Sequence, residues 1–282
     1  MRMIRTIKQL RRALATSRSK GKKIGFVPTM GYFHAGHISL MKASIKDNDV
    51  TVVSLFVNPI QFGPDEDLAK YPRDLKRDSR AAQAAGVDIL FVPSVDQMYP
   101  QPLLTYVDAG RMGDLLCGAT RPGHFRGVVT IVSKLLNIVH PNALYLGQKD
   151  AQQVEVIKKM VRDLNFPVCV KVCPTTRERD GLAMSSRNSY LSPTERAQAP
   201  AIYKALCHAR KMIADGERDA AKINSQIKKL ISDGTNASIV YISCVGLDDF
   251  CITRRIKGDA LIAVAARIGS TRLIDNIVVK VK

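Results

Sequence analysis

Over the first 175 residues the chain alternates between two patterns of apolar and polar positions. Nearly continuous apolar runs, which are typical of parallel strands covered on both faces, recur at 24–28, 50–57, 87–92, 143–146 and 168–173. Apolar residues spaced three and four apart predict helices between these runs, at 37–46, around 75–85, 128–138 and 152–164. This order predicts an α/β fold, a Rossmann-like doubly wound parallel sheet that binds ligands at the carboxyl ends of its strands.

The N-terminal segment supports two interpretations. Residues 1–46 carry eleven basic residues and no acidic one, as a transit peptide does. A buried-type strand begins at Ile24, however, and leaves almost no segment to remove. We therefore expect a first amphipathic helix of the fold, with an apolar face formed by Ile4, Ile7, Leu10 and Leu14.

The pattern changes after residue 175. Two helical stretches, at about 195–214 and 219–233, precede three strand-like runs at 238–245, 260–267 and 273–281. Ser192 and Pro193 mark the first helix start, because proline suits the first helical position. This order predicts a smaller α+β domain, so we divide the chain into domains 1–175 and 176–282, joined near residues 174–178.

Composition narrows the class of protein. The chain has 282 residues, 46% hydrophobic and 24% charged, as globular proteins have, and no apolar run approaches the length of a membrane span. The net charge of +18 raises a nucleic-acid-binding alternative. Basic residues are spread over the whole chain, and aromatic residues make up only 6% of it. We therefore do not expect nucleic acid as a partner. Salt-sensitive retention on RNA or DNA, without ATP turnover, would favour the nucleic-acid-binding alternative.

The six cysteines show no Cys-x-x-Cys pair and no metal-like grouping with histidine. We expect most of them to be reduced core residues of a cytoplasmic protein. Cys169 and Cys173 lie four apart on a predicted strand and would point to the same face. A disulfide or a ligand pair is the alternative there, and core packing is the favoured interpretation.

The clearest chemical signal is the segment from Met30 to His37, which follows the first long strand and opens a helix. Its two histidines, His34 and His37, are separated by Ala35 and Gly36. Imidazole donors and backbone amides at a helix N-terminus form an anion site. The pattern is similar to the "HIGH" signature of adenylyl-transferring enzymes, whereas no Walker-type loop and no Gly-x-Gly-x-x-Gly follows a strand.

Two further segments fit a nucleotide site. The run from Gly147 to Asp150 follows a strand end, where Lys149 can neutralise phosphate. The run from Met184 to Arg187 offers two hydroxyls and a cation on a loop, and it resembles the "KMSKS" type that closes over a triphosphate. Either segment alone could be a solvated turn, but the three together favour an ATP site.

Taken together, these segments resemble those of the pantothenate synthetase (pantoate–β-alanine ligase) family, and the resemblance extends nearly from end to end of the sequence. The segments that carry the resemblance are 28–31, 34–37, 56–62, 71–73, 121–128, 147–153, 180–188 and 272–276. Family members join (R)-pantoate to β-alanine with conversion of ATP to AMP and diphosphate, through a pantoyl adenylate, as the last step of pantothenate synthesis. The resemblance also implies a homodimer.

The resemblance implies residue roles as well. The expected catalytic residues are His37, His34 and Lys149. The expected ATP contacts are Met30, Gly31, Tyr32, Phe33, His34, Ala35, Gly36, His37, Gly147, Gln148, Lys149, Asp150, Thr176, Met184, Ser185, Ser186 and Arg187. Pantoate is expected to bind Gln61 and Gln153, and Gln61 also faces β-alanine. Mg²⁺ accompanies ATP, held mostly by phosphates and water, with Asp78 as its expected protein contact.

Two rival enzymes share parts of this pattern. A nucleotidylyltransferase shares the histidine pair, but the segments around Gln61 and Gln153 argue against it. An aminoacyl-tRNA synthetase shares both signatures, yet only about 95 residues follow Arg187, which leaves little room for a tRNA-reading domain. The chain departs from the family pattern at Phe33, Gln148 and Thr176, and none of these changes removes a catalytic group.

Overall fold

The computed structural model describes residues 1–64 and 66–281. The chain forms two compact units, each described here by itself. The first comprises Met1–Gln148 and Gln152–Pro174, and the second comprises Lys149–Ala151 and Thr175–Lys282. Among the described helices, none combines the length and the apolar character that crossing a membrane requires.

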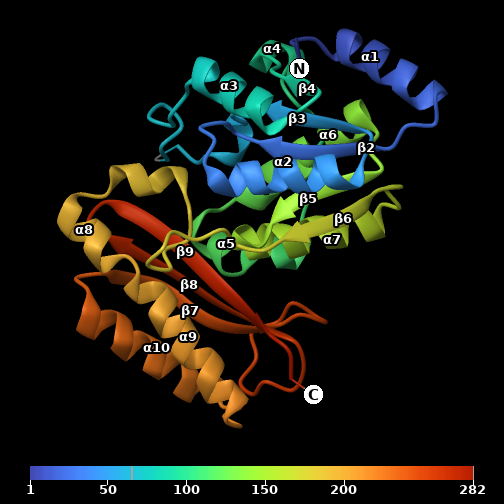
Figure 1. The fold of residues 1–282 in the computed structure, drawn as a ribbon. Coiled ribbons are helices and arrows are strands. Elements are labelled where there is room, and N and C mark those ends of the chain that lie inside the picture. The colour runs from blue at the N-terminus through green and yellow to red at the C-terminus, as the bar shows by residue number, and fades with distance from the viewer. Residues whose placement is uncertain (65, 282) are drawn as a thin grey trace. The chain divides into compact units, whose positions relative to one another are not determined.

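The first unit is built on a six-stranded parallel sheet, which confirms the predicted α/β class (Figure 1). Its strands are β1 (Arg2–Ile4), β2 (Ile24–Thr29), β3 (Val50–Leu55), β4 (Ile89–Phe91), β5 (Ala143–Gly147) and β6 (Cys169–Cys173). Their order across the sheet is β1-β4-β3-β2-β5-β6. The interior strands are almost fully buried, as their continuous apolar runs predict.

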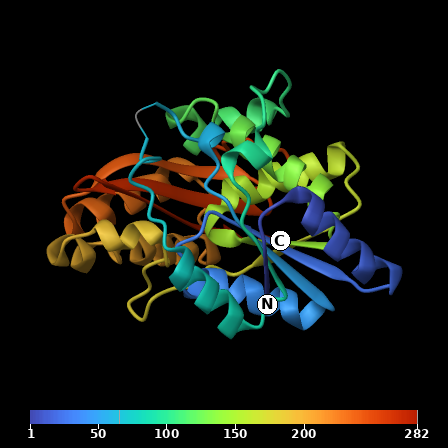
Figure 2. The same cartoon turned by 90° about the horizontal axis from the view of Figure 1, so that it is seen from above.

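Helices cover both faces of this sheet (Figure 2). On one face α2 (Ala35–Asp47) and α3 (Leu75–Ala85) pack against Val27, Val53 and Leu90, all fully buried. Strand side chains alternate between faces, so the neighbouring positions point to the opposite face. There α6 (His124–Val139) lies, with α1 (Ile7–Ser19) packed against it. The other helical segments of this part are η1 (Pro59–Gln61), α4 (Val95–Met98), η2 (Gly110–Asp114), α5 (Cys117–Thr120) and α7 (Ala151–Asp163). The short helix η3 (Gln148–Asp150) ends in residues that belong to the second unit.

The strand order reverses at β2. The chain runs outward from β2 through β3 and β4, and it then returns through α6 to place β5 on the other side of β2. In open α/β sheets this reversal leaves a crevice at the carboxyl ends of the two strands, where ligands bind. The segment after β2 begins at Met30, and β5 ends at Gly147. The topology therefore accounts for two of the three segments singled out in the sequence.

Most boundaries differ from the prediction by a few residues, and two differences change an element. Ile4 belongs to strand β1 and not to the first helix, which begins at Ile7. The single helix expected at about 195–214 is divided into α8 (Pro193–Gln198) and α9 (Ala201–Ala214). Pro200 separates them because it has no amide hydrogen to continue the first helix.

The second unit contains an antiparallel sheet in the order β7-β8-β9 (Ser238–Gly246, Ala260–Ile268, Thr271–Val279). Helices α9 and α10 (Ala220–Gly234) pack on it. Their apolar faces and the sheet share one buried core, which includes Leu206, Ile223, Ile227, Ile262 and Val264. A short helix, η4 (Ser186–Tyr190), precedes α8.

The cysteines are all free thiols, and only Cys117 and Cys244 are buried. The expectation that most cysteines lie in the core was therefore wrong. Core packing was also wrong for Cys169, which is exposed, whereas Cys173 is half-buried and packs against the core of the first unit. Both lie on β6, an edge strand with a single neighbour, which explains the poorer cover of its side chains.

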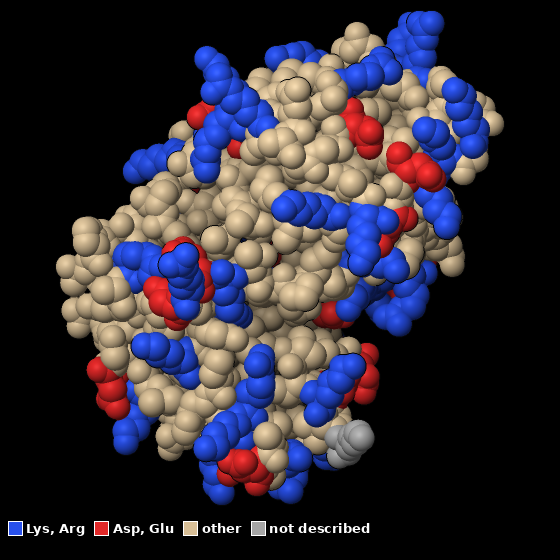
Figure 3. Space-filling model, viewed as in Figure 1, with Lys and Arg blue, Asp and Glu red and all other residues tan. Residues whose placement is uncertain are grey.

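The charge is spread over the visible face rather than gathered in one patch. Figure 3 shows lysine and arginine side chains across that face, with acidic side chains among them. A stripe of basic residues, the usual footprint of nucleic-acid binding, is not seen on this face.

Candidate active site

The segment Met30–His37, called the histidine loop below, joins β2 to α2. Nδ1 of His37 accepts a hydrogen bond from the backbone N–H of His34 at 3.3 Å, and Nδ1 of His34 accepts one from Gly36 N–H at 3.1 Å. The ring centroids lie 4.1 Å apart. Because both Nδ1 atoms accept, each neutral ring carries its proton on Nε2, where it can donate to a phosphate oxygen.

A buried carboxylate fixes the start of this loop. Asp78 on α3 is 1% exposed, and its two oxygens accept from the backbone N–H groups of Tyr32 at 2.6 Å and Phe33 at 2.7 Å. Burial raises the pKa of Asp78, and the two backbone hydrogen bonds oppose that rise. Gly31 has φ of +88°, and a side chain there would lie 3.0 Å from the Asp78 carboxylate, so this turn suits glycine.

Asp78 is a poor direct ligand for Mg²⁺. Both of its oxygens already accept backbone hydrogen bonds, and the side chain is buried behind the loop. Among the described residues, no three of His, Cys, Asp or Glu are grouped to hold a metal ion. The residues present thus do not fit the expected contact between Asp78 and Mg²⁺. The role of Asp78 is instead to hold the histidine loop through its hydrogen bonds to Tyr32 and Phe33.

Phe33, one of the departures from the family pattern, is 3% exposed. Its ring centroid lies 5.5 Å from that of His37. The aromatic side chain therefore supports the histidine from within the core. Arg77 of α3 also contacts this loop, because it donates to Phe33 O at 3.1 Å and stacks 4.5 Å over the Tyr32 ring.

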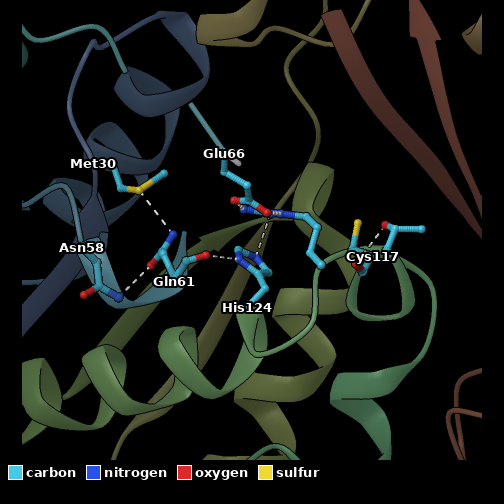
Figure 4. A network of polar contacts seen from close by, with 8 residues as sticks. Met30, Asn58, Gln61, Glu66, Cys117 and His124 are labelled. Atoms are coloured by element: carbon cyan, nitrogen blue, oxygen red, sulfur yellow. Dashed lines mark hydrogen bonds and ion pairs between the residues drawn. The ribbon is translucent and has the colours of Figure 1, made fainter. Parts of the chain in front are cut away.

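Gln61, at the end of η1, lies against the histidine loop (Figure 4). Its amide nitrogen contacts Met30 Sδ at 3.3 Å, and its amide oxygen accepts from Asn58 at 3.0 Å. Tyr99 in turn donates to Asn58 Oδ1 at 2.7 Å, and burial raises the Tyr99 pKa, which keeps its hydroxyl protonated. These contacts orient a largely buried amide that can both donate and accept.

The other predicted pantoate contact, Gln153, is half-buried on α7. Its neighbour Gln152 is buried and binds the chain around Cys117, with which it forms a 2.9 Å hydrogen bond, and it also donates to Met112 O and Leu115 O. Gly147 ends β5, and η3 carries Gln148, Lys149 and Asp150. Within the second unit, Asn276 of β9 donates to Lys149 O at 2.9 Å.

The segment Met184–Arg187, called the serine loop below, lies in the second unit. A short hairpin brings it to Thr176, since Met184 N–H donates to Thr176 O at 3.0 Å and Arg177 pairs with Ala183. Ser185 caps η4 by accepting from Arg187 N–H at 3.3 Å. Two predicted ATP contacts that lie eight positions apart are thus adjacent.

Ion pairs hold this hairpin. Arg177 binds Asp275 of β9 through two hydrogen bonds of 2.6 and 2.9 Å and lies 3.5 Å over the Tyr203 ring. Burial works to lower the pKa of Arg177, but Asp275 outweighs it and raises that pKa. Arg196 of α8 pairs with Glu178 at 2.5 Å and Asp180 at 2.6 Å.

Several residues of this site were not predicted. Asn58, Arg121 and His124 lie in the segments that carry the family resemblance, yet no role was assigned to them. Asp78 was assigned a different role. Asp78 contacts the histidine loop across 45 positions of sequence, and His124 contacts Gln61 O across 63, so periodicity could not reveal these contacts. Arg121 in turn contacts His124.

Comparisons with known proteins identify the family of the chain. The family model for pantoate-beta-alanine ligase matches residues 2–278. A pantothenate synthetase from Acetivibrio thermocellus is 54% identical over 281 residues, which cover 100% of both chains. The crystal structure of the pantothenate synthetase from Thermus thermophilus has a TM-score of 0.93 and 44% identity, over 98% of this chain and 99% of that one.

A third relative has been solved with ligands. It is the pantoate-beta-alanine ligase from Francisella tularensis, complexed with beta-gamma ATP and beta-alanine. That structure has a TM-score of 0.80 and 38% identity, over 98% of this chain and 97% of that one. By the extent of these matches, the chain belongs to the pantoate-beta-alanine ligase family.

Proposed function

We propose that this protein joins (R)-pantoate to β-alanine and converts ATP to AMP and diphosphate in the process. The observation that carries the proposal is the contact between Gln61 and Met30. The Gln61 amide, which suits pantoate's hydroxyls, lies beside the histidine loop. That loop follows β2 at the strand-order reversal, the position at which open α/β sheets bind ligands, and this supports the proposal. Family membership and the complex of the Francisella tularensis relative with an ATP compound and β-alanine support the same reaction.

The first step activates the carboxylate of pantoate. One carboxylate oxygen attacks the α-phosphorus of ATP, the bond from that phosphorus to the bridging oxygen breaks, and diphosphate leaves. Negative charge grows on the phosphate oxygens, so donors already in place lower the barrier. His37 and His34 would donate from Nε2, because their Nδ1 atoms are occupied by backbone N–H groups. Lys149 would neutralise the transferring group.

The serine loop would bind the triphosphate and the departing diphosphate. Ser185, Ser186 and Arg187 supply hydroxyl and guanidinium donors on one short segment. Thr176 would contact the nucleotide next to Met184. Gly147, Gln148 and Asp150, with the histidine loop, complete the proposed nucleotide contacts.

The second step forms the amide. The amine of β-alanine attacks the acyl carbon, the bond from that carbon to the AMP oxygen breaks, and the amine loses a proton. AMP is a better leaving group than the oxide of a free carboxylate, which is why the adenylate must form first. Gln61 and Gln153 would hold pantoate through both steps, with Gln61 also facing β-alanine.

We further propose that Mg²⁺ enters with ATP and is bound by phosphate oxygens and water rather than by Asp78. The protein is expected to be a cytoplasmic homodimer, and light scattering of the purified chain tests its oligomeric state.

An isotope experiment tests the order of the two steps. Pantoate labelled with ¹⁸O in its carboxylate is supplied with ATP and β-alanine, and the AMP is analysed by mass spectrometry. An acyl adenylate transfers one labelled oxygen to AMP. Unlabelled AMP formed together with pantothenate would contradict the adenylate, and no pantothenate at all would contradict the proposed function.

A further inference from the structure

A chain of polar contacts leads from an ion pair to the backbone of Gln61 (Figure 4). Glu66 binds Arg121 through two hydrogen bonds of 2.6 and 2.5 Å. Arg121 Nη1 lies 3.1 Å from Nε2 of His124, and Nδ1 of His124 lies 2.9 Å from Gln61 O. The site's proposed reaction assigns no role to Glu66, Arg121 or His124.

Only one protonation state of His124 satisfies both contacts. A guanidinium can only donate, so Nε2 must accept from Arg121. A carbonyl oxygen can only accept, so Nδ1 must carry a proton and donate to Gln61. In a doubly protonated ring, Nε2–H would face the N–H of Arg121, and two donors cannot form a hydrogen bond. The neutral ring with Nδ1–H is therefore selected, opposite to the Nε2–H rings of His34 and His37.

Glu66 keeps Arg121 in the orientation that this state requires. Burial works to raise the pKa of Glu66, but the hydrogen bond and charge of Arg121, with smaller contributions from a charge on His124 and from the Gly63 backbone, outweigh it and lower that pKa. The carboxylate thus stays ionised near neutral pH and holds two guanidinium nitrogens. The third nitrogen is then aimed at His124.

The backbone carbonyl of Gln61 is coupled to its side chain by close packing. His124 begins α6, and Gly127 one turn later touches η1 so closely that a Cβ there would lie 2.5 Å from Ile60 O and 2.7 Å from Gln61 Cα. Asn58 donates both to Gly127 O at 3.2 Å and to the Gln61 amide oxygen. A shift of the carbonyl would therefore move the amide that contacts Met30.

We propose that His124 is a positioning residue for pantoate: held as its Nδ1–H form by Arg121 and Glu66, it fixes the Gln61 carbonyl and so orients the Gln61 amide. The proposal rests on the proposed function, because it assigns Gln61 to pantoate. It predicts that changes at His124 affect the affinity for pantoate and leave ATP affinity nearly unchanged.

Three substitutions separate positioning from general packing. An asparagine at 124 can place its amide N–H where Nδ1–H lies, whereas a glutamine reaches toward Arg121 and loses the Gln61 contact. Since one hydrogen bond is lost, His124→Ala and His124→Gln should raise the KM for pantoate about tenfold. His124→Asn should raise it no more than about threefold, and the KM for ATP should stay within about twofold in all three.

Two reference variants frame this series. Gln61→Ala shows how far the KM for pantoate rises when the amide itself is lost. His208→Asn, at an exposed position on α9, controls for the loss of a histidine. Equal KM changes for pantoate and ATP, or no advantage of asparagine over glutamine, would overturn the proposal. If the wild type forms no pantothenate, the proposed function fails first, and this inference fails with it.

The protonation state gives a readout that does not depend on activity. Nitrogen-15 NMR of the five histidines distinguishes the two neutral forms, and the signal missing in His124→Asn identifies His124. We expect an Nδ1–H ring at neutral pH, and substitution of Glu66 by glutamine should weaken that preference. An Nε2–H ring or a doubly protonated ring at position 124 would contradict the proposal.

Discussion

The histidine loop and the serine loop are both proposed to contact ATP, but the fold holds them by different means. The histidine loop follows a buried strand, and a 1% exposed carboxylate accepts from its backbone. The serine loop follows a short hairpin. Its Arg177–Asp275 ion pair is largely buried, but the ion pairs of Arg196 with Glu178 and Asp180 are about 30–40% exposed. Buried hydrogen bonds are costly to break, whereas exposed ion pairs contribute little. The two loops should therefore differ in their sensitivity to mutation, salt and pH.

The largest expected effect concerns chemistry in the histidine loop. His37→Ala should fold normally and lose adenylate formation by about 10²–10³-fold, because one donor to the growing phosphate charge is removed. The measurement is the rate of pantoate-dependent AMP release, with the exposed His208→Ala as control. A rate near that of the wild type would remove His37 from the catalytic role.

The second effect concerns the support of the same loop. Asp78→Ala should lower the free energy of unfolding by about 3 kcal/mol, because the Tyr32 and Phe33 N–H groups lose their acceptor in a buried site. Urea unfolding measures this change. Asp74→Ala is the matched control, since Asp74 only caps the same helix and its loss should cost about 1 kcal/mol. If both variants lost the same free energy of unfolding, the contacts between Asp78 and the histidine loop would contribute nothing to stability.

These contacts show what the sequence could and could not predict. The strands β2 and β3 follow from nearly continuous apolar runs, and the histidine loop follows from its position between strand and helix. β1 was missed because it has three residues, two of them exposed, and so presents no buried run. The Asp78 contact joins positions 45 apart, and local patterns carry no information on such pairing.

The serine loop offers the contrasting test. Arg196→Met removes both ion pairs to Glu178 and Asp180 but keeps the aliphatic stem. Because these side chains are partly exposed, the loss of unfolding free energy should be only about 0.5–1 kcal/mol, and added salt should diminish it. Unfolding in low and high salt checks this. If Arg196→Met lowered the free energy of unfolding as much as Asp78→Ala does, the two loops would not differ in how strongly their supporting contacts stabilise the fold.

The smallest expected effect is a difference in titration. Burial raises the pKa of Asp78, while the Arg196 hydrogen bond lowers that of Asp180. Asp180 thus stabilises the fold above its unfolded-state pKa, and this contribution disappears as pH falls through its folded pKa. For Asp78 the sign is opposite, because its contribution is largest at acid pH and declines as pH rises through its folded pKa. Carbon-13 NMR of the two carboxyls should find them on opposite sides of the ordinary aspartate value.

One measurement tests the central claim most directly: AMP formation from ATP with pantoate and β-alanine together, and then with each omitted. We expect AMP when both are present and none without pantoate, because carboxylate activation comes first. AMP formation that does not require pantoate, or no AMP from folded protein under any combination, would contradict the account. In the second case a different acceptor for the same ATP site, or nucleic acid, would have to be tested next.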